Sequence, residues 1–247
     1  MFPLRDHNPS ERTPYVLYAL IAANLGAFLL QLPFTGSERA MLGFWRDWAM
    51  IPVVVTQGGE WHGILTSMFL HAGFLHLAGN MLFLWIFGDN LEDQLGHLGF
   101  LIFYLAAGIA AALAHIAADP GSAIPTVGAS GAIGGVMGGY LLLFPRAKVD
   151  ILLIFVVFFR VFTVPAWVLL GLWFGMQIFS GLSTPTNGGG VAYWAHAGGF
   201  LAGIVLTLPA WLRRGAGAYW RRTEGRPPHP EAEYAPSSIP TIRRRRR

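Results

Sequence analysis

Residues 128–144 read GASGAIGGVMGGYLLLF, seventeen uncharged residues that begin with a serine set between glycines. As a helix rising 1.5 Å per residue, this stretch is roughly 25 Å long. The hydrocarbon core of a bilayer is about 30 Å thick, so the helix is short for a membrane span. We therefore expect Ser130 to lie below the membrane surface, under a cavity that water can fill from one side.

The rest of the chain has the composition of a membrane protein. Of its 247 residues, 54% are hydrophobic and 12% are charged, and the mean hydropathy is +0.49, whereas an average soluble domain carries about 25% charged residues. The chain has no cysteine, which excludes disulfides, thiolate ligands and cysteine nucleophiles. No secretory signal is expected, because the first apolar run is too long for a signal peptide and lacks a cleavage site.

Apolar stretches close to 20 residues long predict an all-α polytopic membrane protein with six transmembrane helices. We expect a short N-terminal segment (1–14), a membrane domain (15–212) and a tail (213–247). The segment 151–164 is apolar but too short for a span, and we interpret it as interfacial or re-entrant, although hydropathy leaves a seventh span open. The six expected spans are residues 15–32, 64–88, 98–118, 128–144, 165–182 and 191–212.

The distribution of basic residues predicts the orientation. With both termini cytoplasmic, fifteen Lys and Arg residues fall inside and only Arg39 and Arg46 fall outside, which is a clear positive-inside bias. The basic charge thus follows the membrane topology and does not indicate nucleic-acid binding. Between the second and third spans, Asp89 and Glu92 have the spacing of a capping box for the third helix.

The tail is rich in Pro, Arg and small polar residues, and we expect it to be disordered. It ends in Arg243–Arg247, which would attract anionic lipid headgroups at about 1 kcal/mol per arginine. A plain solvated positive-inside tail is an equally good interpretation.

Two polar residues inside expected spans suggest a nucleophile and a base. Polar groups at membrane depth are costly and usually functional, and Ser130 together with His196 is the minimum set for nucleophilic acyl transfer. Gly199 and Gly203 follow His196 on a small-residue face that would pack against another helix. Because Ala132 replaces the last glycine of G-x-S-x-G, an α/β-hydrolase is excluded. With acidic residues only at span ends, we expect a dyad; helix packing alone is the simpler alternative.

A second polar pair lies in the second span. His76 and Asn80 are four residues apart, so they share a helical face and could donate to an oxyanion. Gly128 would let the backbone approach closely, and we include it with His71 among the supporting residues. His71 lies about 140° around the helix from His76 and is expected to face elsewhere, toward water. Three histidines could bind zinc, but no H-E-x-x-H motif is present and we expect no metal.

Together these residues resemble the rhomboid family of intramembrane serine proteases. The resemblance covers residues 14–212, and its motifs stand in order on three expected spans. Residues 68–73 and 79–85 also resemble bacterial members. The matching motifs are His76-x-x-x-Asn80, Gly128-x-Ser130-Gly131 and Ala195-His196-x-x-Gly199-x-x-x-Gly203.

The resemblance implies a six-helix bundle in a bacterial inner membrane, with the active site open to the outer face. It makes Ser130 the nucleophile and His196 the general base, while His76, Asn80 and the Ser130 N–H form an oxyanion hole. It implies single-span membrane proteins as substrates and no cofactor. It also implies a partly submerged first loop (45–60) and a mobile loop near the substrate (183–192).

The chain departs from the family pattern at two positions. Many members carry Trp-Arg in the first loop, whereas Trp61 is followed here by His62, which puts the anchoring of that loop in question. Some members place an aromatic residue one turn after the nucleophile, stacked on the catalytic histidine, and here that position is Gly134. The residue that holds His196 is therefore not evident.

Two other functions are compatible with parts of this pattern. A catalytically silent rhomboid-like protein that binds or escorts membrane clients is the main alternative, although silent relatives typically lose the serine or the histidine. A small six-span transporter would show internal repeats or broken helices in its two halves, and no such symmetry is visible.

Overall fold

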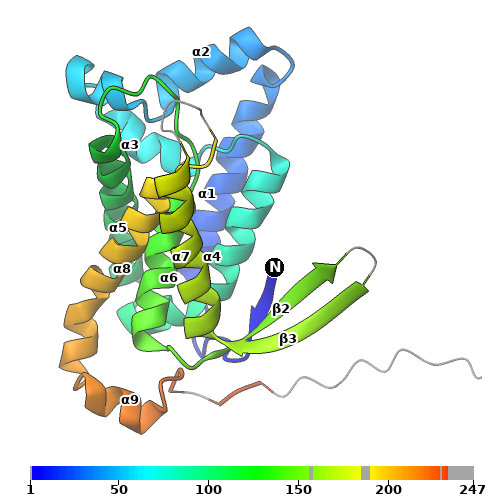
Figure 1. Ribbon diagram of the computed structural model, residues 1–247, viewed down its shortest axis with the longest axis vertical. Helices are drawn as coiled ribbons and strands as arrows, with labels where there is room; N and C mark the ends of the chain where they lie inside the picture. Colours follow the sequence, from blue (N-terminus) through cyan, green and yellow to red (C-terminus); the bar gives the residue numbers. More distant parts are fainter. Residues whose placement is uncertain (1, 156–157, 185–189, 229, 233–247) are drawn as a thin grey trace, which may run out of the picture.

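The computed structural model describes residues 2–155, 158–184, 190–228 and 230–232. Its long helices run side by side along the long axis of the molecule, with α2 (Glu38–Trp48) and α3 (His62–Thr66) at one end and a small sheet with α9 (Gly217–Thr223) at the other (Figure 1). The elements are β1 (Phe2–Asp6), α1 (Tyr15–Gln31), η1 (Leu32–Phe34), α2 (Glu38–Trp48), η2 (Val54–Gly58), α3 (His62–Thr66), η3 (Ser67–Phe69), α4 (Phe74–Leu95), α5 (His97–Ala118), α6 (Ser130–Leu143), β2 (Lys148–Phe155), β3 (Phe158–Pro165), α7 (Ala166–Ser183), α8 (Tyr193–Arg213) and α9 (Gly217–Thr223).

Four of the described helices are long and apolar enough to cross a membrane, namely α1 with η1, α5, α7 and α8. A fifth span results if the bent pair formed by α3–η3 and α4 is counted as one. Helix α6 is apolar but has only 14 residues, or about 21 Å. The chain is therefore a helical membrane protein with four or five candidate spans of full length.

The second expected span is wrong as a single helix. The chain bends by 90° between η3 and α4, and Leu70 at the bend is extended. At the bend, the side chain of Gln31 forms hydrogen bonds with the backbone of His71. Its Nε2 donates to the carbonyl oxygen of His71 (2.5 Å), and its Oε1 accepts from the His71 N–H (3.3 Å). Because a side chain satisfies these peptide groups, the helix can break inside the bundle.

Helix α6 is the centre of the bundle, packed against α4, α5 and α8. Every residue from Gly131 to Tyr140 is buried. Glycines let α6 and α8 meet backbone to backbone, because a side chain at Gly199 would collide with the carbonyl of Gly131, and one at Gly203 with that of Gly135. The glycines of α6 and α8 therefore let the two backbones touch, and this contact brings the starts of the two helices together.

A three-stranded sheet corrects the expectation of an all-α protein. The order is β1-β2-β3, with both pairs antiparallel. The described residues of the segment 151–164 belong to β2 and β3, which pair antiparallel, so a seventh helical span is wrong. Its run of Val, Ile and Phe favours strands over helix, whereas hydropathy reports only that the segment is apolar.

The capping box expected for the third helix is also wrong, because Asp89 and Glu92 lie inside α4, which continues to Leu95. The Glu92 carboxylate is buried and accepts hydrogen bonds from the backbone N–H groups of Val16 (3.0 Å) and Leu17 (2.8 Å). It therefore caps the first turn of α1, whose N–H groups have no partner within their own helix.

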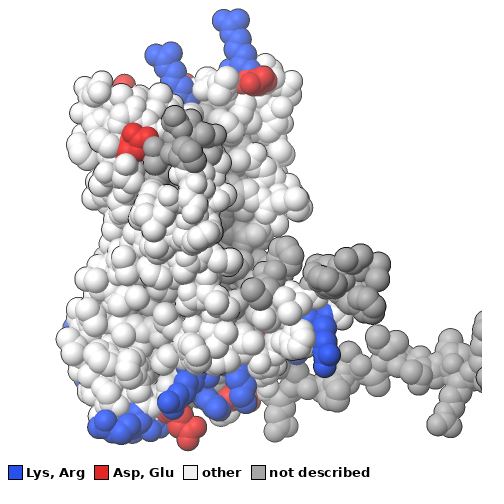
Figure 2. All heavy atoms as spheres, in the orientation of Figure 1, with Lys and Arg blue, Asp and Glu red and all other residues white. Residues whose placement is uncertain are grey.

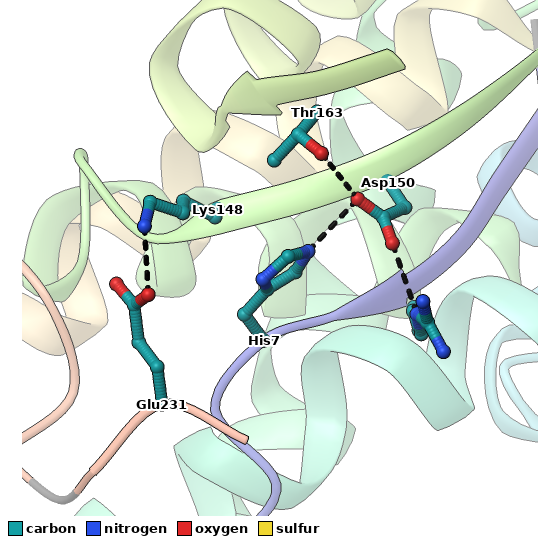
Figure 3. A network of polar contacts seen from close by, with 6 residues as sticks. His7, Lys148, Asp150, Thr163 and Glu231 are labelled. Atoms are coloured by element: carbon teal, nitrogen blue, oxygen red, sulfur yellow. Dashed lines mark hydrogen bonds and ion pairs between the residues drawn. The ribbon is translucent and has the colours of Figure 1, made fainter. Parts of the chain in front are cut away.

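A polar network ties the N-terminal segment to the sheet (Figure 3). Asp150 on β2 accepts from Thr163 Oγ1 (2.6 Å), Arg5 Nε (2.9 Å) and His7 Nε2 (2.8 Å). Burial by itself would raise the pKa of Asp150, but these hydrogen bonds outweigh burial and lower it. Asp6 behaves in the opposite way: burial, followed by the nearby charge of Asp89, raises its pKa to about 8.

The tail is partly ordered, which differs from the expected disorder after residue 212. Helix α9 packs under the bundle, and the indole N–H of Trp220 donates to the carbonyl oxygen of Leu142 (2.9 Å). Arg243–Arg247 lie outside the described residues. Figure 2 shows Lys and Arg gathered at the end that carries α9, a few more at the α2 end, and a nearly uncharged band between them.

Candidate active site

Ser130 and His196 lie within hydrogen-bonding distance, although 66 residues separate them in the chain. Ser130 is the first residue of α6, and His196 lies in the first turn of α8. The serine Oγ is 2.7 Å from His196 Nε2. The backbone contact of α6 with α8 sets this distance, because it aligns the starts of the two helices.

The pair lines a cavity of about 480 Å³. Its walls come from α2, the loop 120–127, and the first turn of α8 with the residues before it. The loop is held by backbone hydrogen bonds to the segment after α2: Met50 and Thr126 exchange two (3.1 and 2.8 Å), and Val53 N–H donates to the carbonyl oxygen of Ser122 (3.0 Å). An ordered loop thus keeps the space above Ser130 open.

Helix α7 supplies the neighbours of His196 that the sequence analysis did not find. His196 Nδ1 lies 2.8 Å from Oε1 of Gln177, and the ring of Trp173 packs on the imidazole at 5.8 Å between centroids with a 30° tilt. A side chain at Gly134 would meet the carbonyl oxygen of His196 at 2.9 Å. The aromatic residue that some family members place there cannot fit, and Trp173 provides a ring from another helix.

His76 faces the cavity from α4. The N–H of Ala72 donates to His76 Nδ1 (3.3 Å), so the ring proton resides on Nε2, which is free to donate. Gly128 lies under this ring, and a Cβ there would be 2.9 Å from His76 Cε1. Gly128 has φ +134°, a region that favours glycine, and its own N–H donates to Ser67 (2.9 Å). Gly128 therefore provides space for His76 but not its amide hydrogen.

Asn80 contacts the backbone of His76, and His71 takes a position that differs from the one expected. The Asn80 amide donates to the carbonyl oxygen of His76 (3.1 Å), and Asn80 is not among the described residues that line the cavity. His71 was expected to face water, but it is buried, with its ring 5.1 Å from that of His76. His71 does not follow the helical spacing of 140° from His76, because it precedes α4 and is not helical.

His62 takes the place of the arginine that many family members have in the first loop. Its Nε2 lies 2.7 Å from the carbonyl oxygen of Asp47, and its ring meets Trp48 edge-on. Thr66 Oγ1 also donates to the carbonyl oxygen of Trp48 (2.6 Å). These contacts hold the end of α2 against α3. The loop around Gly188 lies outside the described residues.

The site has the parts needed for acyl transfer. With the Nδ1 proton of His196 donated to Gln177, the Nε2 lone pair accepts the Ser130 hydroxyl proton. The Ser130 N–H is in the first turn of α6, where amides lack helical acceptors. Among the described residues, no group of three His, Asp or Glu side chains is arranged to hold a metal ion.

Residues 58–213 match the family model described as the rhomboid domain. The chain belongs to the rhomboid family. It is 35% identical over 168 residues to the rhomboid protease GluP of Bacillus subtilis, covering 66% of this chain and 29% of that protein. It is 33% identical to rhomboid protein 1, mitochondrial, of Saccharomyces cerevisiae, covering 77% and 51%. It is 32% identical to rhomboid-like protein 11, chloroplastic, of Arabidopsis thaliana, covering 84% and 69%. The first two of these rhomboids are thus considerably longer than the matched region.

Proposed function

We propose that this rhomboid is an intramembrane serine endopeptidase that cleaves single-span membrane proteins. The observation that carries the proposal is the 2.7 Å contact between Ser130 Oγ and His196 Nε2 at the floor of a cavity. A serine that only packs helices has no need of an imidazole at its hydroxyl. The similarity to the rhomboid protease GluP supports the same conclusion.

In the proposed reaction, His196 Nε2 takes the hydroxyl proton as Ser130 Oγ attacks the scissile carbonyl carbon. The Ser130 N–H and the His76 Nε2–H donate to the oxyanion that forms on the carbonyl oxygen. When the tetrahedral intermediate collapses, His196 gives its proton to the leaving amine. Water then enters from the cavity and attacks the acyl ester while it loses a proton to His196. As the ester bond breaks, His196 gives this proton to Ser130 Oγ, which releases the carboxylic acid product and restores both residues.

We also propose the topology. If the bent pair and the short α6 both count as spans, the bundle crosses the membrane six times, and both termini lie on one side. The basic side chains at the α9 end favour a cytoplasmic position for that end, so the cavity beside α2 opens to the outer face. We further propose that the protein lies in a bacterial inner membrane. Its chain would then consist of an N-terminal segment (1–14), a membrane domain (15–212) and a tail (213–247).

Labelling with a small fluorophosphonate tests the function directly. The detergent-solubilised protein should form a covalent adduct, and Ser130→Ala and His196→Ala should each abolish it. Cleavage of a reconstituted single-span substrate should disappear in the same two variants. A folded parent protein that neither labels with several probes nor cleaves would point instead to a silent rhomboid that binds membrane clients.

A further inference from the structure

We infer that Gln177 is the positioning residue that makes His196 a base, so that Ser130, His196 and Gln177 act together as a triad; this inference rests on the proposed function. Gln177 lies on α7 and is only 8% exposed. Its Oε1 is 2.8 Å from His196 Nδ1, on the opposite side of the imidazole from Ser130. It touches the base and not the reacting atoms.

The orientation of the Gln177 amide decides the protonation of the imidazole. If Nε2 of Gln177 faced the ring, it would donate to Nδ1 and leave the ring proton on the nitrogen that faces Ser130. His196 could not then act as a base. The structure places Nε2 of Gln177 3.4 Å from the carbonyl oxygen of Trp173, to which it donates. This contact directs Oε1 toward Nδ1, so Nδ1 holds the proton and Nε2 keeps its lone pair for the serine.

A neutral amide suits a base at membrane depth. In serine hydrolases with a soluble triad, an acidic residue orients the histidine and stabilises the imidazolium. A carboxylate within the bilayer would be costly when the imidazole is neutral. The Gln177 amide gives the orientation without the charge. The other described titratable side chains that line the cavity are those of His76, His115, Asp119 and Tyr193.

Two packing constraints complete the arrangement. The Trp173 ring covers one face of the imidazole, while close contact of the His196 backbone with Gly134 fixes the position of α8. With α8 fixed, the imidazole of His196 can move only by rotation about the side-chain torsions of His196. The hydrogen bond to Gln177 selects one rotamer of that side chain. Removing that bond should release the ring without moving the helices.

Three variants at residue 177 separate positioning from packing. Gln177→Leu keeps the volume and removes the acceptor, so kcat should fall about 10- to 100-fold, as when the outer partners of metal-bound histidines are removed, with KM nearly unchanged. Gln177→Asn is one methylene too short and should lose activity as well. Gln177→Glu keeps an acceptor and adds a negative charge, so it should retain more activity than Gln177→Leu and move the acidic limb of the kcat/KM profile to higher pH.

Asn24→Leu is the matched control. Asn24 is a fully buried amide on α1 whose Nδ2 donates to the carbonyl oxygen of Leu20 (2.8 Å), and it is not among the described residues that line the cavity. The Asn24→Leu protein should change in thermal stability by an amount similar to that of Gln177→Leu, while its kcat and its pH profile should stay equal to those of the parent. A kcat for Gln177→Leu within twofold of the parent, or an equal loss in Asn24→Leu, would overturn the inference. An unshifted profile in Gln177→Glu would do the same.

A spectroscopic measurement keeps this test independent of catalysis. The imidazole ¹⁵N signals of His196, assigned by comparison with His196→Ala, should report a proton on Nδ1 in the parent and a mixed tautomer population in Gln177→Leu. If the parent fails to label with fluorophosphonates, the proposed function fails while the tautomer result still stands. An unchanged His196 spectrum in Gln177→Leu would refute the positioning role by itself.

Discussion

Adding one methyl group at Gly203 should disable the site from two helical turns away. The ideal Cβ of Gly203→Ala would lie 2.5 Å from the carbonyl carbon and 2.6 Å from the Cα of Gly135. Carbon atoms in contact prefer separations of about 3.5–4.0 Å, so α6 and α8 must move apart by about 1 Å. The obstacle is backbone, and no rotamer change can relieve it.

The same displacement should reach the dyad. His196 is seven residues, or about 10.5 Å, from Gly203 on the same helix. A shift of about 1 Å would lengthen the 2.7 Å contact between Ser130 and His196 beyond hydrogen-bonding range. Misplacement on that scale can cost about 10²-fold in rate, and overpacking of this kind typically costs about 1–3 kcal/mol of stability.

The assay is cleavage of a reconstituted single-span substrate, with fluorophosphonate labelling rate and thermal unfolding measured on the same preparations. Gly26→Ala on α1 is the control, because nothing lies within 4 Å of its ideal Cβ, and it should be neutral or stabilising by about 0.4–1 kcal/mol. If Gly203→Ala cleaves the substrate at the parental rate and has the same melting temperature as Gly26→Ala, the contact between α6 and α8 does not set the geometry of the dyad.

Two further predictions concern His76 and Asn80 near the start of α4, and Asp6 in strand β1. His76→Phe removes a donor that faces the cavity and should lower kcat by about 10²–10³-fold, whereas Asn80→Leu should cost less, because its amide donates to the His76 carbonyl oxygen; equal losses in steady-state cleavage would contradict this difference. Asp6 has a pKa of about 8 in the folded protein against 3.8 as its ordinary value, so the folded state holds a proton that the unfolded state releases, and stability should fall as pH rises from about 4 to 8. Asp6→Asn should flatten this dependence in thermal unfolding at pH 5 and pH 8, and an identical dependence in both proteins would show that Asp6 is not its source.

Much of the candidate site could be predicted because each of its motifs is a short stretch of neighbouring residues. Ser130 and His196 stand out as polar groups in apolar helices, and their motifs are short and ordered. Gln177 was missed although it is also polar in an apolar helix. One amide carries little chemistry by itself, and its meaning depends on the partner that it meets 19 residues later.

The fold could be predicted only where hydropathy decides the structure. Hydropathy located α1, α5, α7 and α8 to within a few residues, but it gave no sign of the break before α4. It also does not distinguish a strand from a helix, so β2 and β3 were missed. The acidic residues of α4 were misassigned because Glu92 caps a helix 75 residues earlier in the chain. Such distant partners are a property of the packed bundle and leave no periodic signal.

That capping contact has a consequence for biosynthesis. A chain is made from its N-terminus, so the first turn of α1 is complete as a segment long before Glu92 exists. Strand β1 likewise pairs with β2, and Phe2 lies opposite Leu152. Strand β1 and the first turn of α1 therefore have to wait for partners that are synthesised later, and 145 residues separate Arg5 from its partner Asp150.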